Sequence, residues 1–387
     1  MQRLGFTGVV SALALSAVIC VGCGEPFLAG SGGAGGGPTT TTTTTGGGAG
    51  GEGGMIAGGG GSGGMTSGGG QGGGGCTPGD AATCPAGEYC VASTLECAPC
   101  AVLGGVLQFA AAQPLGIQGP AANPSFPRSR QNGAAEEMVF VVQGESGGGS
   151  DTDLAVATRS GGSWSAGQFV AGDVINTASP ESAPLYLPES VQIQGLPSAA
   201  GRILFGGYNN MRRQIFAAAP DSPSRSQVPG VNDSIYDTYS FAVAYEASPM
   251  RYWYMRKVGA SFAPKLVTQL PGQNYTIVPD IKLPGGMCNV NLDAMVDIAP
   301  WVTPKGDFLL FHADWSASCG GGGDRRGFYV EVDPATGSPK GNAQELSITG
   351  LPDDADVRTP ALSGDLCSVY FASSYEGTPQ LYGARRQ

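Results

Sequence analysis

Two distant segments of this chain repeat each other. The segments that begin at Phe241 and at Phe371 share seven of sixteen positions, which are Phe, Ala, Tyr, Glu, Pro, Tyr and Arg. They start 130 residues apart, which fits three structural units of about 43 residues each. Because each unit of such an array buries its faces against its neighbours, this repetition constrains the fold more than any other feature of the sequence.

Looser copies of the same unit occur elsewhere after residue 100. Each copy has an apolar strand that ends near an aromatic residue, a polar turn and a second apolar strand. The paired strands are Met138–Phe140 with Asp153–Val156, Ile203–Phe205 with Gln214–Phe216, and Leu309–Phe311 with Gly327–Val330. No stretch keeps a helical period for three turns, so we expect an all-β domain over residues 101–387. Five units are visible directly, and radial closure into a β-propeller is the architecture that they favour.

The last unit resembles a known repeat. It reads Thr359-Pro-Ala-Leu-Ser-Gly-Asp365, then Val369-Tyr-Phe-Ala-Ser373, then Gln380-Leu-Tyr382. This is similar to the TolB-type repeat, also called the WD40-like PD40 repeat, although Gly364-Asp365 has the reversed order and Gln380 replaces an aspartate. The resemblance implies six blades, with an N-terminal strand near Val106–Ala112 closing the ring.

The N-terminus predicts export and lipidation. Residues 1–22 combine Arg3 with an apolar run too short to span a membrane comfortably. Cys20-Val-Gly-Cys23 resembles a bacterial lipoprotein box, which implies that Cys23 carries acyl chains as a lipid anchor. An ordinary cleaved signal with an incidental cysteine is the alternative. Since Gly24 follows Cys23, the resemblance implies a cell-envelope protein anchored to the outer membrane, facing either the periplasm or the surface.

A tether separates this anchor from the rest of the chain. Residues 23–75 are rich in glycine, contain seven consecutive threonines at Thr39–Thr45 and carry almost no charge. Such a low-complexity linker buries too little apolar surface to offset its ordering entropy, so we expect disorder. The tether resembles the Gly/Thr linkers of myxobacterial lipoproteins.

Residues 76–100 form a cysteine-rich module. Its five cysteines are Cys76, Cys84, Cys90, Cys97 and Cys100, and three more, Cys288, Cys319 and Cys367, lie in the main domain. We expect disulfides among these eight in an exported chain. Both sets are odd in number, so full oxidation requires at least one bridge between the module and the main domain. The alternative is two free thiols, one in each region. A redox pair at Cys97 and Cys100 and a zinc site are the competing interpretations.

No residue stands out as catalytic, cofactor-binding or metal-binding. Gly144-Glu-Ser146-Gly-Gly148 matches the serine-hydrolase pattern, but no helix follows Ser146, and His312 is the chain's single histidine. We interpret Trp164 as blade packing rather than as part of a sialidase-like box. No cofactor is expected, and calcium is the ion that two acidic loops, Asp151–Asp153 and Asp353–Asp356, would suit.

The net charge of the chain limits the classes of partner that it can bind. The chain has a net charge of −11, which disfavours nucleic acid because phosphates repel an acidic surface. We therefore predict a non-enzymatic binding or scaffold module of the cell envelope, whose propeller face binds a protein, peptide or glycan. The alternative is a propeller hydrolase or lyase that acts on polysaccharide.

Overall fold

The computed structural model describes residues 75–387, except 120–121, 133–134, 145–150, 171–173, 197–202, 210, 221, 223, 233–234, 259–263, 285–288, 291–299 and 316–323. The described residues belong to a compact unit that spans residues 71–387. The predicted signal, Cys23 and nearly all of the predicted tether lie outside the described residues, as do Ser146, Cys288 and Cys319.

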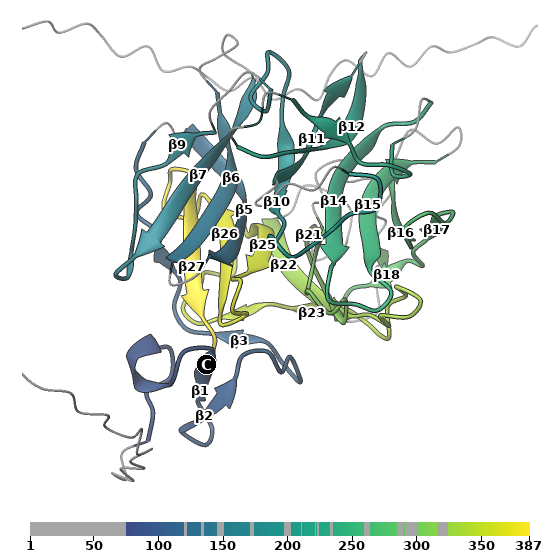
Figure 1. The fold of residues 1–387 in the computed structure, drawn as a ribbon. Coiled ribbons are helices and arrows are strands. Elements are labelled where there is room, and N and C mark those ends of the chain that lie inside the picture. Colours follow the sequence, from purple (N-terminus) through teal and green to yellow (C-terminus); the bar gives the residue numbers. More distant parts are fainter. Residues whose placement is uncertain are drawn as a thin grey trace, which may run out of the picture. The chain divides into compact units, whose positions relative to one another are not determined.

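The domain is a five-bladed β-propeller (Figure 1). Each blade is an antiparallel sheet in which the chain generally runs from the innermost strand outwards. Blade 1 contains β5 (Ala122–Asn132), β6 (Ala135–Gln143), β7 (Thr152–Ser160) and β8 (Ser163–Trp164), with β9 (Gln168–Phe169) also paired to β7. Blade 2 contains β10 (Ser182–Tyr186), β11 (Ile203–Asn209), β12 (Arg212–Ala218) and β13 (Ser226–Gln227). Blade 3 contains β14 (Thr238–Ala244), β15 (Arg251–Lys257), β16 (Pro264–Gln269) and β17 (Thr276–Ile277).

Blades 4 and 5 follow the same plan. Blade 4 contains β20 (Trp301–Val302), β21 (Phe308–Trp315), β22 (Asp324–Glu331) and β23 (Gln344–Glu345). Blade 5 contains β25 (Arg358–Leu362), β26 (Ser368–Ser373), β27 (Gln380–Arg385) and the N-terminal β4 (Gln113–Pro114). Two short pairs lie outside the blades: β3 (Gln108–Phe109) runs parallel to β24 (Ser347–Ile348), and β18 (Ile281–Lys282) pairs with β19 (Asn289–Val290).

The ring closes after five blades rather than the expected six. The innermost strands β5, β10, β14, β20 and β25 contact one another in turn, and β25 returns to β5. An N-terminal strand does complete the last blade, but that strand is β4 and lies just beyond the predicted segment Val106–Ala112. Within that segment, Leu107 and Phe109 are buried between blades 4 and 5, and β3 pairs with β24, so it spans two blades instead of forming a sixth.

Every blade buries both of its faces. In β6, Met138 and Phe140 pack toward blade 5, whereas the intervening Val139 and the following Val141 pack toward blade 2. Successive side chains of a strand point to opposite faces, so an uninterrupted apolar run supplies two cores at once. Similar apolar layers fill the boundaries between blades 2 and 3, 3 and 4, and 4 and 5.

The aromatic spacing of the repeat corresponds to cross-strand contacts. Phe205 lies directly opposite Phe216 in the β11–β12 hairpin, and Phe371 lies opposite Tyr382 in β26–β27. The ring centres are 5.9 and 5.7 Å apart, within the range of favourable aromatic pairs. In blades 2 and 5 the recurrence of an aromatic residue after eleven positions therefore reflects the length of the hairpin between the second and third strands. Phe241 and Tyr252 instead lie in the first and second strands of blade 3, where Phe241 pairs with Tyr254. The segment at Phe241 is thus out of phase with the segment at Phe371, and the expectation of three units between them is wrong.

Three innermost strands share a distortion next to a proline. Phe126, Ala183 and Thr359 have positive φ angles of 54°, 45° and 50°, and each precedes a proline. A proline is tolerated at these positions because an innermost strand is a sheet edge, where one row of N–H groups has no ladder partner. Thr359 also ties three blades together: its Oγ1 accepts from the Phe126 N–H at 2.9 Å, and its own N–H donates to His312 Nδ1 at 3.2 Å.

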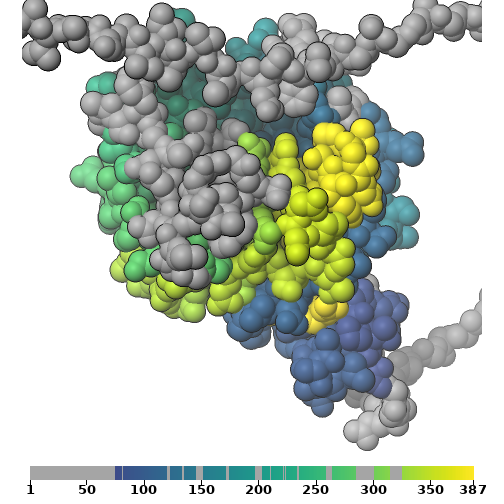
Figure 2. Space-filling view, turned by 180° about the vertical axis from the view of Figure 1, so that it is seen from behind, coloured from purple at the N-terminus to yellow at the C-terminus, as the bar shows by residue number. Residues whose placement is uncertain are grey.

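The cysteine-rich module packs against one end of the ring, which we call the module end (Figures 1 and 2). It contains a 3-10 turn (Ala81–Thr83) and the hairpin β1 (Glu88–Val91) with β2 (Glu96–Pro99). Arg386, which is 2% exposed, donates to the carbonyl oxygens of Cys100 and Val102, and its guanidinium carbon lies 4.3 Å from the centre of the Tyr89 ring. The hairpins between second and third strands lie at the opposite end, the far end.

The three described disulfides match the cysteine arithmetic. Cys76 pairs with Cys90 and Cys84 with Cys97, while the odd module cysteine, Cys100, bridges to Cys367 in blade 5. The prediction of a covalent link between the module and the main domain is confirmed. Among the described residues, no helix is long and apolar enough to cross a membrane.

We predict that the double variant Cys100→Ser/Cys367→Ser unfolds at a lower temperature than the wild type. The bridge joins residues 267 positions apart, so its loss frees the unfolded chain and costs on the order of 3–5 kcal/mol. Differential scanning calorimetry measures the change. After proteolytic cleavage in the 101–106 segment, the module should stay attached until a reductant is added, whereas release without reductant would contradict the bridge. Cys84→Ser/Cys97→Ser, which removes a bridge within the module, is the matched control.

Candidate functional site

Three carboxyl groups meet at the far end, at the boundary of blades 1 and 2. Glu181 directly precedes the innermost strand β10, Asp151 directly precedes β7, and Asp153 lies within β7. The backbone holds these segments together: the Glu181 N–H donates to the Thr152 carbonyl at 2.8 Å, and Thr152 Oγ1 donates to the Glu181 carbonyl at 2.7 Å. The connection from blade 1 to blade 2 therefore places a glutamate next to a pair of aspartates.

All three carboxyl groups are buried. Glu181 is 0% exposed, Asp153 is 1% exposed and Asp151 is 6% exposed. A Cβ atom at position 144 would collide with the Asp153 carboxylate, so Gly144 is required for close packing there. Buried carboxyl groups this close together are unusual, because each charge opposes the ionisation of the next.

Glu181 holds its proton at neutral pH. Burial raises the pKa of its carboxyl to about 8, and the nearby charges of Asp153 and Asp151 raise it further, against hydrogen bonds from Thr177 that favour the ionised form. Thr177 Oγ1 donates to Oε1 at 2.7 Å, and the Thr177 N–H lies 3.3 Å from both carboxyl oxygens. Oε1 therefore accepts the stronger hydrogen bond from Thr177, and Oε2 is the natural position for the proton.

The neighbouring groups are a second carboxyl and an arginine. The pKa of Asp151 is raised by burial and by the nearby charge of Asp153. Its Oδ2 atom has no hydrogen-bond partner within the described part of the chain. Arg225 Nη2 donates to the Tyr208 carbonyl at 2.8 Å, and its charge is near enough to Glu181 to interact with it. The site therefore combines a proton-bearing carboxyl, a second carboxyl and a cation.

This combination suits general acid catalysis. A carboxyl that keeps its proton near pH 7 can donate it to a leaving group, while a carboxyl that ionises at lower pH can act on the opposite side of the reacting bond. Glycoside hydrolysis uses such a pair of carboxyl groups.

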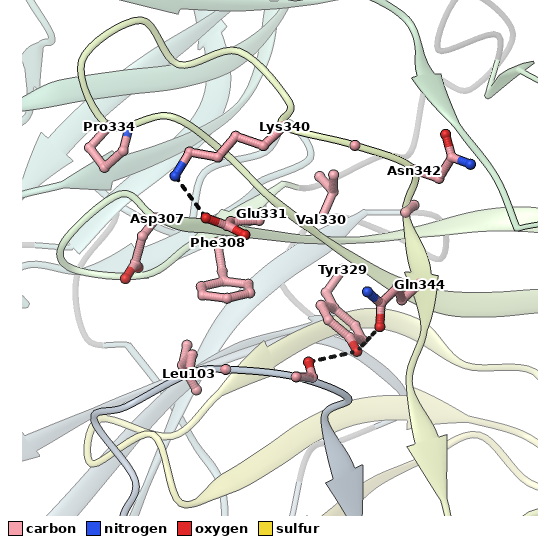
Figure 3. Close-up of a pocket in the computed structure, with 14 residues that line it drawn as sticks. Leu103, Asp307, Phe308, Tyr329, Val330, Glu331, Pro334, Lys340, Asn342 and Gln344 are labelled. Carbon is pink, nitrogen blue, oxygen red and sulfur yellow. Dashed lines mark hydrogen bonds and ion pairs between the residues drawn. The ribbon is translucent and has the colours of Figure 1, made fainter.

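A cavity lies elsewhere, at the module end of blade 4 (Figure 3). It has a volume of about 670 Å³ and a mainly polar lining that includes Tyr329, Glu331, Lys340 and Gln344. Its polar groups are already engaged, because Lys340 Nζ donates to Glu331 at 2.7 Å and Tyr329 Oη donates to Gln344 at 2.6 Å. The groove offers binding contacts but no poised acid.

A smaller cavity of about 280 Å³ lies between the module and loops of blades 3, 4 and 5. Asp307 and Asp365 in its lining each accept a hydrogen bond at 2.5 Å, from Thr303 and Ser363 respectively. Both aspartates therefore stabilise repeat turns, which leaves the far end as the better candidate for chemistry.

The described cysteines form neither a redox pair nor a zinc site. Cys97 and Cys100 belong to two different disulfides, so they are not a redox pair. The sulfur atoms of Cys76, Cys84 and Cys97 lie close together, but each is oxidised and has no thiolate to offer zinc.

The other candidate residues from the sequence have structural surroundings. Burial lowers the pKa of His312 to about 3, helped by nearby arginine charges, so the ring is neutral. Trp164 packs edge-on against Tyr370 at 5.9 Å, between blades 1 and 5. Of the two acidic loops, Asp356 forms an ion pair with Arg358, whereas Asp151–Asp153 belongs to the candidate site.

Glu181 is the residue that sequence reasoning missed. Its signal is positional: Glu181-Ser-Ala-Pro184 aligns with Pro124-Ser-Phe-Pro127 and Val357-Arg-Thr-Pro360, which share the positive-φ residue before a proline in an innermost strand. Only Glu181 places a carboxyl just before the strand in these three copies. Aligning the innermost strands, rather than the outer hairpins, would have marked Glu181 together with Asp237, which directly precedes β14.

No protein-family model matches the chain, and no curated protein matches it. Among solved structures, the fold is similar to the α-L-arabinofuranosidase PaAbf62A from Podospora anserina in complex with cellotriose, with 11% identity over 73% of this chain and 97% of that chain, and a TM-score of 0.46. It is also similar to the GH43_1 enzyme from Xanthomonas citri complexed with xylose (14% identity, 71% and 89% covered, TM-score 0.44) and to a thermostable family-43 glycoside hydrolase (9% identity, 70% and 91% covered, TM-score 0.43). At these identities the likeness concerns the fold.

These structures correct the functional expectation. The solved structures named above are glycoside hydrolases, and this finding contradicts the prediction of a non-enzymatic binding or scaffold module. The repeated hairpins could not distinguish an enzyme from a scaffold, because the apolar residues that they repeat pack the blades, and both classes of protein share that packing.

We predict that Glu181→Gln raises the melting temperature, and that the gain grows as the pH rises from 4.5 to 8. The folded-state pKa of about 8 lies above the ordinary 4.5, so the wild type loses stability over this interval and levels off above it. Differential scanning calorimetry at pH 4.5, 6, 7 and 8.5 tests this. Glu331→Gln, at a half-exposed carboxylate, is the control. A gain that does not change with pH would show that Glu181 ionises normally.

Proposed function

We propose that this chain is a glycoside hydrolase that acts on polysaccharide, with Glu181 as its general acid. The observation that carries the proposal is the buried Glu181 carboxyl, which keeps its proton at neutral pH beside two further carboxyl groups. Its position just before an innermost strand places it at the far end of the ring, beside hairpins that differ from blade to blade in length and sequence.

The proposed reaction uses two carboxyl groups in complementary states. Glu181 donates its proton to the glycosidic oxygen as the bond from that oxygen to the anomeric carbon breaks. The Asp151 carboxylate takes a proton from the water that attacks the anomeric carbon, so the products are two sugars with free hydroxyl groups. Proton exchange with solvent then returns Glu181 to the acid and Asp151 to the carboxylate. Burial keeps the pKa of both groups high, and the charge of Asp153 adds to this effect.

We predict that Glu181→Gln lowers the rate of glycoside hydrolysis by about 10²–10⁴-fold, because general acid catalysis contributes a factor of this size. The wild-type rate should fall as the pH rises above about 8, where Glu181 loses its proton. The assay measures 4-nitrophenol release from arabinofuranosides, xylosides and mannosides, and reducing sugar release from the matching polysaccharides.

The leaving group separates an acid from a merely structural residue. With a 2,4-dinitrophenyl glycoside, whose leaving group needs no proton, Glu181→Gln should recover most of the wild-type rate. Glu331→Gln at the module end should behave as the wild type throughout. Equal losses with both leaving groups would remove Glu181 as the acid, and no hydrolysis of any substrate by the wild type would remove the proposed function.

We also propose that Cys23 is a lipid anchor that holds this enzyme at the outer membrane on the Gly/Thr tether. The lipoprotein-like Cys20–Cys23 segment and the uncharged linker support this. The relation of the blades to the TolB type is a further proposal, supported by the sequence of blade 5 from Thr359 to Tyr382.

We predict that wild-type protein expressed with its signal is found in the outer-membrane fraction with added acyl mass, and that Cys23→Ala is soluble after export. Intact-mass measurement and membrane fractionation check both statements. Cys20→Ala is the control and should leave the anchor in place. Wild-type protein that is soluble and unmodified would contradict the anchor.

A further inference from the structure

Tyrosine and arginine side chains gather at the far end of blades 2 and 3. This tyrosine–arginine surface consists of Tyr208, Arg213, Tyr236, Tyr239, Arg256 and Tyr275. It is built from the β11–β12 hairpin, the start of β14 and the end of β15, which lie in neighbouring blades (Figure 1). Tyr275 comes from the turn between β16 and β17, which follows the module-end side of β16, and its ring reaches to 4.6 Å from the Arg256 guanidinium carbon. Five of the six residues are partly exposed, and Arg256 is buried beneath them.

Arg213 lies between two tyrosine rings. Its guanidinium carbon is 5.3 Å from the centre of the Tyr208 ring and 5.4 Å from that of Tyr239. Nε donates to Tyr208 Oη at 2.8 Å, which fixes the orientation of the planar group. The two terminal nitrogens make no hydrogen bond within the described part of the chain. Their donors are thus held in place and available to an acceptor.

The local charge is opposite to that of the whole protein. Arg212, Arg213, Arg256 and Lys257 lie together at these strand ends, in a chain whose net charge is −11. Asp237 is the neighbouring described carboxylate, and it is already engaged by the Arg213 backbone N–H at 3.0 Å and by the Tyr239 hydroxyl. A basic patch on an acidic protein attracts an anionic ligand.

This surface adjoins the candidate catalytic site. A Cβ atom at Gly206 would lie 2.6 Å from the Tyr239 carbonyl oxygen and 2.7 Å from the Ser182 hydroxyl. Ser182 follows Glu181 directly, so the backbone of Tyr239 and the strand that carries Glu181 are in close contact. A chain of sugars bound over Tyr208 and Tyr239 would extend toward Glu181.

We propose that the tyrosine–arginine surface binds a uronate residue of an acidic polysaccharide, which makes uronate-containing glycans the substrate class of this enzyme. The guanidinium of Arg213 pairs with the uronate carboxylate, since its fork of donors matches a carboxylate in geometry and charge. The tyrosine rings of Tyr208 and Tyr239 present flat apolar faces to the C–H face of the sugar, with hydroxyl groups at the rim. The choice of a glycan rests on the proposed function, whereas the choice of a carboxylate rests on the geometry of Arg213.

The test measures binding rather than hydrolysis. Isothermal titration calorimetry of the full chain compares tri-galacturonic acid with the galactose trisaccharide of the same linkage, which carries hydroxymethyl groups in place of the carboxylates. We expect binding of the acidic trisaccharide, weakening as salt is added, and no comparable binding of the neutral one. Arg213→Gln should weaken binding roughly tenfold or more, and Arg213→Lys, which keeps the charge but loses the fork, should be intermediate.

Two controls make the result decisive. Arg326→Gln removes the same charge from an arginine of blade 4 that pairs with Glu345, and it should bind as the wild type. Melting temperatures identify any variant that fails to fold. If Arg213→Gln does not fold, Tyr208→Phe, which removes only the hydroxyl that accepts the hydrogen bond from Nε, provides the second test. Equal binding of both trisaccharides, unchanged binding by Arg213→Gln, or full competition by millimolar inorganic phosphate would overturn the inference.

The outcome is separable from that of the proposed function. Glu181→Gln should bind tri-galacturonic acid as the wild type does while losing hydrolysis. Binding by a chain that hydrolyses no glycoside would leave this inference standing and remove the proposed function. Hydrolysis of neutral glycosides without binding of the acidic trisaccharide would do the reverse.

Discussion

The fold depends on blades that are apolar on both faces. Met138, Phe140 and Val142 of β6 face blade 5, and Val139 and Val141 face blade 2, so blade 1 cannot be stable with either neighbour missing. The same alternation in every blade leaves no position at which the array can stop. Closing the sheets into a ring satisfies all the faces at once, and the N-terminal β4 completes the last of them.

For the ring to stay closed, neighbouring blades must also be held together at its axis and at the module end. At the axis, Thr359 connects β5, β25 and His312 of β21 through its side chain and its strained backbone. At the module end, the Cys100–Cys367 bridge and Arg386 hold the chain that leads into β4. The module thus secures the segment whose detachment would open blade 5. The far end has no such cover among the described residues, and it is there that the carboxyl groups and the tyrosine–arginine surface are found.

The candidate site is a consequence of how one blade crosses to the next. A glutamate buried at a blade boundary would ordinarily be disfavoured, because desolvation opposes its charge. In this propeller the chain brings Glu181 against Asp151 and Asp153 through backbone hydrogen bonds to Thr152, and the carboxyl keeps its proton instead. The destabilising environment and the proposed chemistry have the same origin. Arg213, one blade further on, is held in the same way by fixed neighbours, in its case two tyrosine rings.

The sequence by itself determined the all-β class, the presence of repeated hairpins and, if all the cysteines are oxidised, the need for a disulfide between the module and the main domain. These follow from local pattern and from counting: strand alternation is visible in consecutive residues, and two odd sets of cysteines cannot both pair internally. The tertiary structure decided that there are five blades rather than six, that β4 and not Val106–Ala112 closes the ring, and that Cys367 is the partner of Cys100. It also located the candidate site. Asp151 and Asp153 lie about 30 positions before Glu181, and no pattern in the residues between them indicates that the backbone brings these carboxyl groups together. Proximity across a blade boundary depends on the angle at which two sheets pack, and that angle is set by the side chains of the whole ring rather than by any one segment of it.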